Sequence, residues 1–267
     1  MEPKPKHALI TGASRGIGRG IALKLAGQGV HVAVHYYRNQ AAAEETLDEI
    51  RRRGADGFTI QADVRRPDQI EAAFRSVRQR FGKLDIFVAN ARPEKEDFFA
   101  PPMDLTLEQW DNACDSQAKA FLVGVREAGS LMGAGGRILA ITYAAGSRTG
   151  GFQPWIGMGS AKAAMESMVR YFAVALAPRG ITVNAISPGW TEDSVLNSLP
   201  AEVQDLIRNW HGRGWTPMRR LGTPQDIGDV ASLFCSAQAQ WITGQVIHAD
   251  GGASLMLPEV PPELQVG

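Results

Sequence analysis

A glycine-rich turn near the amino terminus constrains the fold of this chain more than any other feature. The turn reads Thr-Gly-Ala-Ser-Arg-Gly-Ile-Gly over residues 11–18, and it follows a short apolar run at residues 8–10. Ile17, Ile21 and Leu25 then recur at four-residue steps, which is the periodicity of a helix. A tight turn at a helix start binds phosphate, because its free backbone N–H groups and the helix dipole both favour an anion. The turn therefore predicts a nucleotide site.

Each glycine of the turn has a steric reason. Gly12 permits the tight turn, Gly16 leaves room for a pyrophosphate, and Gly18 lets the helix pack closely on the strand. The spacing is G-x-x-x-G-x-G, which differs from the general dinucleotide pattern G-x-G-x-x-G. An ordinary tight turn would also contain glycine. The order strand, turn, helix favours the nucleotide interpretation.

Segments typical of strands and of helices alternate along the rest of the chain. Short apolar or β-branched runs predict six further strands, at residues 30–34, 58–60, 84–88, 137–141, 181–186 and 245–248. Apolar stripes at helical spacing lie between them, and a capping box at Thr106 and Gln109 opens a long helix that continues to Met132. This alternation predicts an α/β fold of Rossmann type, with a doubly wound, seven-stranded parallel sheet and helices on both faces.

Composition and length favour one domain spanning residues 1–267. The chain is 44% hydrophobic, which is enough for a large core, and its formal net charge is zero, which argues against nucleic acid and anionic membranes as partners. No apolar run is long enough for a signal peptide or a membrane-spanning helix. Cys114 and Cys235 lie far apart, and no Cys/His cluster suggests a metal. We expect a cytoplasmic protein without a metal site.

Two segments depart from the regular alternation. Residues 190–220 are loop-rich and follow the end of a predicted strand, where α/β proteins bind ligands, so we expect a substrate lid there. Residues 257–267 form a proline-bearing tail, which we expect to be a surface extension or a subunit contact.

The residues after the second predicted strand indicate which dinucleotide binds. NAD sites usually place an acidic residue there to bind the ribose 2′-hydroxyl, whereas this strand ends His-Tyr-Tyr-Arg-Asn at residues 35–39. Arg38 can pair with a 2′-phosphate, and it is also compatible with a solvated loop residue. The absence of an acidic residue favours NADPH as the cofactor.

The glycine turn resembles that of the short-chain dehydrogenase/reductase family, and the resemblance extends over nearly the whole chain. Residues 88–92 (Val-Ala-Asn-Ala-Arg) are similar to the family's N-N-A-G segment, residues 187–189 to its P-G segment, and residues 250–252 to its ending. The resemblance implies that Arg15 lies near the 2′-phosphate and that the protein forms a homotetramer. The cofactor contacts implied by motif and resemblance together are Gly12, Ser14, Arg15, Gly16, Ile17, Gly18, Tyr37, Arg38, Asp63, Val64, Asn90, Lys162, Pro188, Gly189 and Thr191.

The catalytic residues depart from the family's common form. Most members carry a serine on the fifth strand and then Tyr-x-x-x-Lys, but here Tyr143 takes the serine position and Met158 precedes Lys162 by four residues. Gln117 stands at the family's asparagine position, where it is compatible both with supporting a water chain and with lying on the helix surface. The arrangement is most similar to the NADPH-dependent enoyl-acyl-carrier-protein reductases, which have a tyrosine near the end of the fifth strand and a second one in Tyr-x6-Lys. Trp155 replaces that second tyrosine.

The missing tyrosine bears on the reaction. Reducing a ketone makes a strongly basic alkoxide that needs a proton at once, whereas reducing an enoyl thioester makes a less basic enolate that a neutral donor can hold. We therefore expect an NADPH-dependent enoyl reductase of fatty acid synthesis, acting on a thioester of acyl carrier protein or CoA. Lys162 would bind the nicotinamide ribose, while Tyr143 and Trp155 would bind the thioester oxygen.

Two alternatives remain open at this point. The chain is also compatible with a carbonyl reductase, 3-oxoacyl reductase or alcohol dehydrogenase that uses Tyr143 as its acid. The departures from the family pattern are equally compatible with an NADPH-binding regulatory protein that has lost catalysis.

Overall fold

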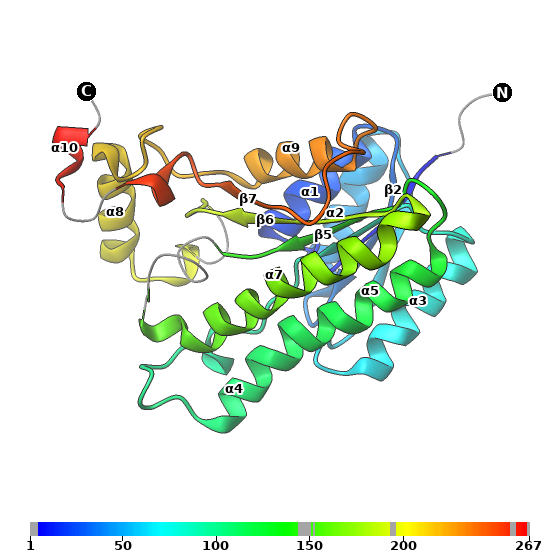
Figure 1. The fold of residues 1–267 in the computed structure, drawn as a ribbon, viewed down its shortest axis with the longest axis horizontal. Coiled ribbons are helices and arrows are strands. Elements are labelled where there is room, and N and C mark those ends of the chain that lie inside the picture. Colours follow the sequence, from blue (N-terminus) through cyan, green and yellow to red (C-terminus); the bar gives the residue numbers. More distant parts are fainter. Residues whose placement is uncertain (1–4, 144–150, 152, 193–195, 257–259, 266–267) are drawn as a thin grey trace.

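A parallel sheet of seven strands runs through the centre of the molecule, in the order β3-β2-β1-β4-β5-β6-β7 (Figure 1). The computed structural model describes residues 5–143, 151, 153–192, 196–256 and 260–265. The strands are β1 His7–Ile10, β2 His31–Tyr36, β3 Gly57–Gln61, β4 Ile86–Ala89, β5 Arg137–Ile141, β6 Thr182–Pro188 and β7 Val246–Ala249. The predicted fold class is confirmed, and each predicted strand is present with its bounds shifted by a few residues at most.

Helices cover both faces of the sheet (Figure 1). One face carries α1 (Gly16–Ala26), α2 (Gln40–Arg52) and α9 (Pro224–Cys235), and the other carries α3 (Pro67–Phe81), α5 (Ala120–Leu131) and α7 (Ile156–Leu176). The capping box predicted at Thr106 and Gln109 is present and opens α4 (Leu107–Cys114), which leads through one π-helical turn into α5. Within the described part of the chain, no helix has both the length and the apolar character needed to cross a membrane.

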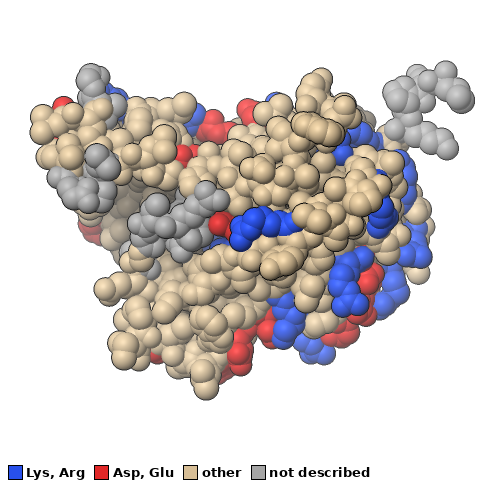
Figure 2. Space-filling model, in the orientation of Figure 1, with Lys and Arg blue, Asp and Glu red and all other residues tan. Residues whose placement is uncertain are grey.

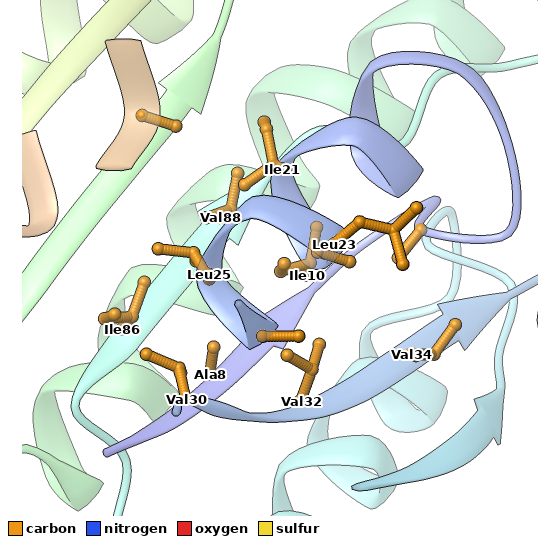
Figure 3. Packing of buried hydrophobic residues seen from close by; sticks show 14 of the residues in the cluster. Ala8, Ile10, Ile21, Leu23, Leu25, Val30, Val32, Val34, Ile86 and Val88 are labelled. Carbon is orange, nitrogen blue, oxygen red and sulfur yellow. The ribbon is translucent and has the colours of Figure 1, made fainter. Parts of the chain in front are cut away.

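The core on the α1 face explains why the strands read as continuous apolar runs. Ile10, Val32 and Val88 point from three neighbouring strands toward α1, which presents Ile21 and Leu25 to them (Figure 3). The other face buries a second cluster beneath α3, α5 and α7. Because helices cover the parallel sheet on both sides, successive residues of the central strands β1, β4 and β5 are nearly all buried and mostly apolar, whereas the edge strands β3 and β7 keep exposed positions.

The segment predicted to be loop-rich contains a helix, α8 (Ala201–Trp210), so that part of the prediction was wrong. Val203, Ile207 and Trp210 recur at helical spacing and form one apolar side. No described residue of α8 is buried, and the helix stands at one end of the molecule beside α10 (Pro262–Gln265) (Figure 1). Of the predicted lid and tail, residues 193–195, 257–259 and 266–267 lie outside the described part of the chain.

The surface agrees with a net charge of zero. Acidic and basic side chains are interleaved near α3 and α5 on the face drawn in Figure 2. An extended patch of one sign, of the kind that binds nucleic acid, is not seen on this face.

The glycine turn is anchored where the strand order changes direction, between β1 and β4. The side-chain amide of Asn90 donates to the carbonyl oxygens of Thr11 (2.9 Å) and Gly12 (3.1 Å). The hydroxyl of Thr11 accepts in return from the backbone N–H groups of Asn90 (2.9 Å) and Ala91 (3.0 Å). These bonds connect the loop after β1 to the loop after β4, at the edge where doubly wound sheets bind their ligands.

A buried histidine at the end of β2 completes this anchor. His35 Nδ1 accepts from the backbone N–H of Gly12 (3.0 Å), and its Nε2 lies 3.1 Å from the carbonyl oxygen of Ala62 after β3. Both contacts are satisfied when Nε2 carries the proton and the ring is neutral. Burial lowers the pKa of His35 to about 4, which keeps it neutral at ordinary pH.

The contact between α1 and α9 leaves no room for a side chain at Gly20. A Cβ there would overlap the carbonyl oxygen of Pro224, at the start of α9. We expect Gly20→Ala to lower the free energy of unfolding by about 1–3 kcal/mol, the usual cost of overpacking. Gly27→Ala is the matched control, since Gly27 is exposed, lies in a right-handed helical conformation and has no neighbour within 3.4 Å. Urea unfolding of both variants checks this, and equal stabilities would contradict it.

Protonation of His35 predicts a loss of stability in mild acid. Its pKa is about 4 in the folded protein and about 6.5 in the unfolded chain, so the unfolded chain takes up the proton first as the pH falls. The free energy of unfolding should therefore decrease by about 3 kcal/mol from pH 6.5 to pH 4 on account of this residue. His35→Gln removes the titrating group. Urea unfolding at pH 7 and pH 4.5 should show a weaker pH dependence in the variant, and an unchanged dependence would refute the assignment.

Candidate active site

A cavity of about 410 Å³ lies at the carboxyl ends of the strands, around the anchored glycine turn. The structure brings together in it residues from the loops that follow six of the strands. Of the site residues predicted from the sequence, all except Gly16 and Gly18 line this cavity: Gly12, Ser14, Arg15, Ile17, Tyr37, Arg38, Asp63, Val64, Asn90, Tyr143, Trp155, Lys162, Pro188, Gly189 and Thr191.

The glycine turn has the backbone geometry that the sequence predicts for an anion site. Gly12 and Gly16 have positive φ angles of 66° and 56°, which only glycine adopts without strain. A Cβ at Gly18 would overlap the carbonyl oxygen of Gly12, so Gly18 serves the packing of α1 against the turn. Among the described residues, no side chain caps the start of α1 and none in its first turn is acidic. The amino end of α1 is therefore suited to a phosphate.

One end of the cavity carries three arginines, two of which contact Tyr37. The guanidinium of Arg38 lies 4.7 Å from the ring centre of Tyr37, and that of Arg65 lies 5.6 Å from it. Arg65 also donates to the hydroxyl of Tyr37 (3.0 Å) and to both carboxylate oxygens of Asp63 (2.8 and 3.0 Å). Arg15 faces Glu94 across the cavity at 3.6 Å. Arg15 and Arg65 are thus paired with carboxylates that line the same cavity, whereas Arg38 donates a side-chain hydrogen bond to the Tyr37 hydroxyl. Arg38 is therefore the arginine best placed to pair with an anionic group at this end.

The opposite end holds a buried lysine. The Lys162 ammonium donates to the carbonyl oxygen of Ile141 at the end of β5, at 2.5 Å. Burial, together with the positive charge of Arg92, lowers the pKa of Lys162 to about 7, and the carboxylate of Glu166 partly opposes that shift. A cation of reduced pKa at the base of a cavity is typical of a functional site.

Tyr143 lines the same cavity as Lys162 and lies two residues beyond the end of β5. Its ring stacks on that of Trp155, with centres 5.5 Å apart and planes 26° from parallel. Trp155 precedes α7 directly and packs on Phe98, at 5.0 Å between ring centres. Burial raises the pKa of Tyr143 to about 12, so the phenol keeps its proton and acts as a hydrogen-bond donor. The two aromatic side chains predicted to be catalytic therefore lie together.

The position four residues before Lys162 is apolar in structure as well as in sequence. Met158 is buried with Phe98 and Ala113, and it lines the cavity. Gln117 lies in the π-helical turn Asp115–Lys119 and is buried, donating to the carbonyl oxygen of Ala91 at 2.9 Å. It is thus no helix-surface residue, and such π turns often mark functional sites.

A second cavity of about 470 Å³ adjoins the first and is walled mainly by apolar side chains. Val203, Ile207 and Trp210 of α8 form one wall, and Phe98 and Phe99 form another. This contact explains why the apolar side of α8 has no buried residue: it faces a cavity, where a core helix would face packed side chains. The cavity can accommodate a bulky apolar group beside the first site.

Arg65, Arg92 and Trp190 are among the lining residues that the sequence did not identify as part of the site. Arg65 follows Asp63 and Val64 directly, so its place at the cavity could have been inferred from its neighbours. Arg92 ends the segment 88–92, where the family's N-N-A-G has glycine. Its charge, in a loop after a central strand, was the signal that could have identified it.

The comparisons with known proteins agree with this geometry. A family model described as enoyl-(acyl carrier protein) reductase matches residues 12–254. The chain is 38% identical to 1-cyclohexenylcarbonyl-CoA reductase of Streptomyces collinus over 94% of this chain and 88% of that protein. It is 34% identical to 3-oxoacyl-(acyl-carrier-protein) reductase FabG of Staphylococcus epidermidis, over 92% and 98%.

A solved structure is similar over the same extent. The angucycline C-6 ketoreductase LanV with bound NADP superimposes with a TM-score of 0.84 at 35% identity, covering 94% of this chain and 96% of that one. The family match and the structural similarity both cover more than nine-tenths of this chain. The chain belongs to the short-chain dehydrogenase/reductase family of oxidoreductases.

Proposed function

We propose that this chain binds NADPH in the 410 Å³ cavity and reduces a carbonyl group of an apolar substrate. The dinucleotide fits the residues present. The amino end of α1 would hold the pyrophosphate, Arg38 and Arg15 the 2′-phosphate, and Lys162 the hydroxyls of the nicotinamide ribose. The bound NADP of the similar ketoreductase LanV supports this choice of cofactor.

The observation that carries the choice of reaction is the position of Tyr143, which lines both cavities. A bound NADPH would supply a hydride, with both of its electrons, to a carbon of the substrate. A ketone oxygen then bears a negative charge, and the oxygen of the resulting alkoxide is more basic than a phenolate. Because the pKa of Tyr143 is about 12, its phenol is protonated at ordinary pH and can donate its proton to that oxygen.

The comparisons favour this reaction over the enoyl reduction expected from the sequence, because the similar proteins include FabG and LanV, which are named for reducing keto groups. Enoyl thioester reduction remains the second candidate. It is favoured by Met158, which cannot donate a proton where most family members have tyrosine, and by the similar 1-cyclohexenylcarbonyl-CoA reductase. The homotetramer, the cytoplasmic location and the acyl carrier protein or CoA thioester stay predictions.

The second cavity is the proposed site of the substrate's apolar part. Burying a ring or acyl chain against Phe98, Trp190 and Val203 would remove apolar surface from water on both sides of the contact. The segment 190–220, with α8 in it, would then act as the lid over the substrate. In this proposal the predicted single domain, residues 1–267, holds both the cofactor and the substrate.

Arg38→Ala tests the cofactor. Loss of the bidentate partner for a 2′-phosphate should raise the Kd of NADPH roughly tenfold or more and leave that of NADH nearly unchanged. Nicotinamide fluorescence during titration measures both constants. Arg53→Ala, at the carboxyl end of α2 and away from the cavity, is the matched control. Equal losses for NADPH and NADH would contradict the role of Arg38.

Turnover of matched substrates tests the reaction. Acetoacetyl-CoA and a bulky cyclic ketone should oxidise NADPH faster than crotonyl-CoA does, as followed by nicotinamide absorbance. Tyr143→Phe should lower kcat for the ketone by about 100-fold or more, because the proton donor is gone. Tyr171→Phe, 76% exposed on α7, is the control. Faster turnover of crotonyl-CoA would favour the second candidate, and NADPH binding without any turnover would favour a regulatory protein.

A further inference from the structure

Among the residues that the structure describes, four line both cavities: Arg92, Tyr143, Trp155 and Trp190. They mark the place where the cofactor cavity opens into the apolar cavity. A substrate whose apolar part lies in the second cavity, and whose reacting carbon faces a cofactor in the first, must present its carbonyl group at this junction.

Arg92 is the one charged side chain among these four described residues. Lys162 lines only the first cavity, and Lys95 and His211 line only the second. Arg92 belongs to the loop after β4, two residues beyond Asn90, whose bonds to the glycine turn fix the start of that loop. Its guanidinium donates to the carbonyl oxygen of Pro93 at 2.9 Å, which holds part of the side chain against its own loop.

We propose that Arg92 binds the substrate's carbonyl oxygen and stabilises the negative charge that develops there. The proposal rests on the proposed reduction and names a further residue of the same site. A ketone oxygen and a thioester oxygen conjugated to a double bond both gain charge in the reduction, so the role of Arg92 holds for either candidate reaction.

The physical argument is electrostatic. The junction is walled by two indoles, a phenol and the apolar cavity, so a guanidinium there interacts with an oxyanion more strongly than it would in water. Arginine keeps its proton at any ordinary pH, so it supplies charge and hydrogen bonds and leaves the proton transfer to Tyr143. Most family members place a tyrosine four residues before the lysine. Met158 at that position gives the oxygen no donor, and Arg92 supplies one from the opposite loop.

Turnover is the first test. Arg92→Gln should lower kcat roughly 100-fold, while the Kd of NADPH stays within about threefold. Arg92→Lys should retain part of the activity, because it keeps the charge and loses the planar fork. Free guanidinium ion at low, non-denaturing concentration should partly restore the turnover of the Arg92→Ala variant. Arg66→Gln, which lies outside both cavities and pairs with Asp68 on the surface, is the control.

Binding of a charged analogue is the second test, and it needs no turnover. Cyclohexanecarboxylate carries the negative oxygen of the reacting state, and cyclohexanecarboxamide is its neutral counterpart. In the complex with NADP⁺, Arg92→Gln should raise the Kd of the carboxylate by about tenfold or more and change the Kd of the carboxamide little. Equal effects on both ligands, or wild-type carboxylate affinity in the variant, would overturn the role of Arg92. A wild-type enzyme that binds the carboxylate through Arg92 but reduces no substrate would instead overturn the proposed function alone.

Discussion

The junction of β1 and β4 is the constraint on which the rest of the site depends. Two parallel strands end side by side there, and the chain leaves them in opposite directions. Beyond the N–H of Thr11, which still donates to Val88, several backbone groups of the two loops therefore have no neighbouring strand to bond to. Asn90, the Thr11 hydroxyl and the imidazole of His35 satisfy these groups. The turn that results points the amino end of α1 into the cavity, and the loop carrying Arg92 starts from the same bonds. Changing this junction would move both halves of the site.

Charged side chains line one end of the site, and mainly aromatic and apolar side chains line the other. Arginines gather at the end of the cavity that faces β2 and β3, where an anionic part of a dinucleotide would lie, while the other end is aromatic and holds Lys162 in a buried place. Burying that ammonium is costly, and the structure offsets the cost with the carbonyl of Ile141 and with Glu166 one turn further along α7. Burial also keeps water from screening the charges that act on the substrate.

The helix α8 shows why part of this arrangement was beyond the sequence analysis. Its apolar residues recur at helical spacing, but proline and glycine on either side made the stretch read as loop. The periodicity of apolar residues predicts that one side of a helix is shielded from water. It does not show whether the protein core or a bound substrate shields that side. The same holds for Gln117, which the pattern left open between the surface and the site and which the π turn buries. Such a turn depends on packing between helices, and local propensity does not encode it.

The sequence by itself determined the fold class, the place of the glycine turn and many of the residues around the cavity, because each depends on local order: strand, turn, helix and the residues just past each strand. Only the tertiary structure decided that Tyr143 stacks on Trp155, that α8 walls an apolar cavity, and that Arg92 stands where the two cavities meet. These contacts join residues from separate loops. Their distances follow from how the loops pack together, which no spacing along the chain specifies.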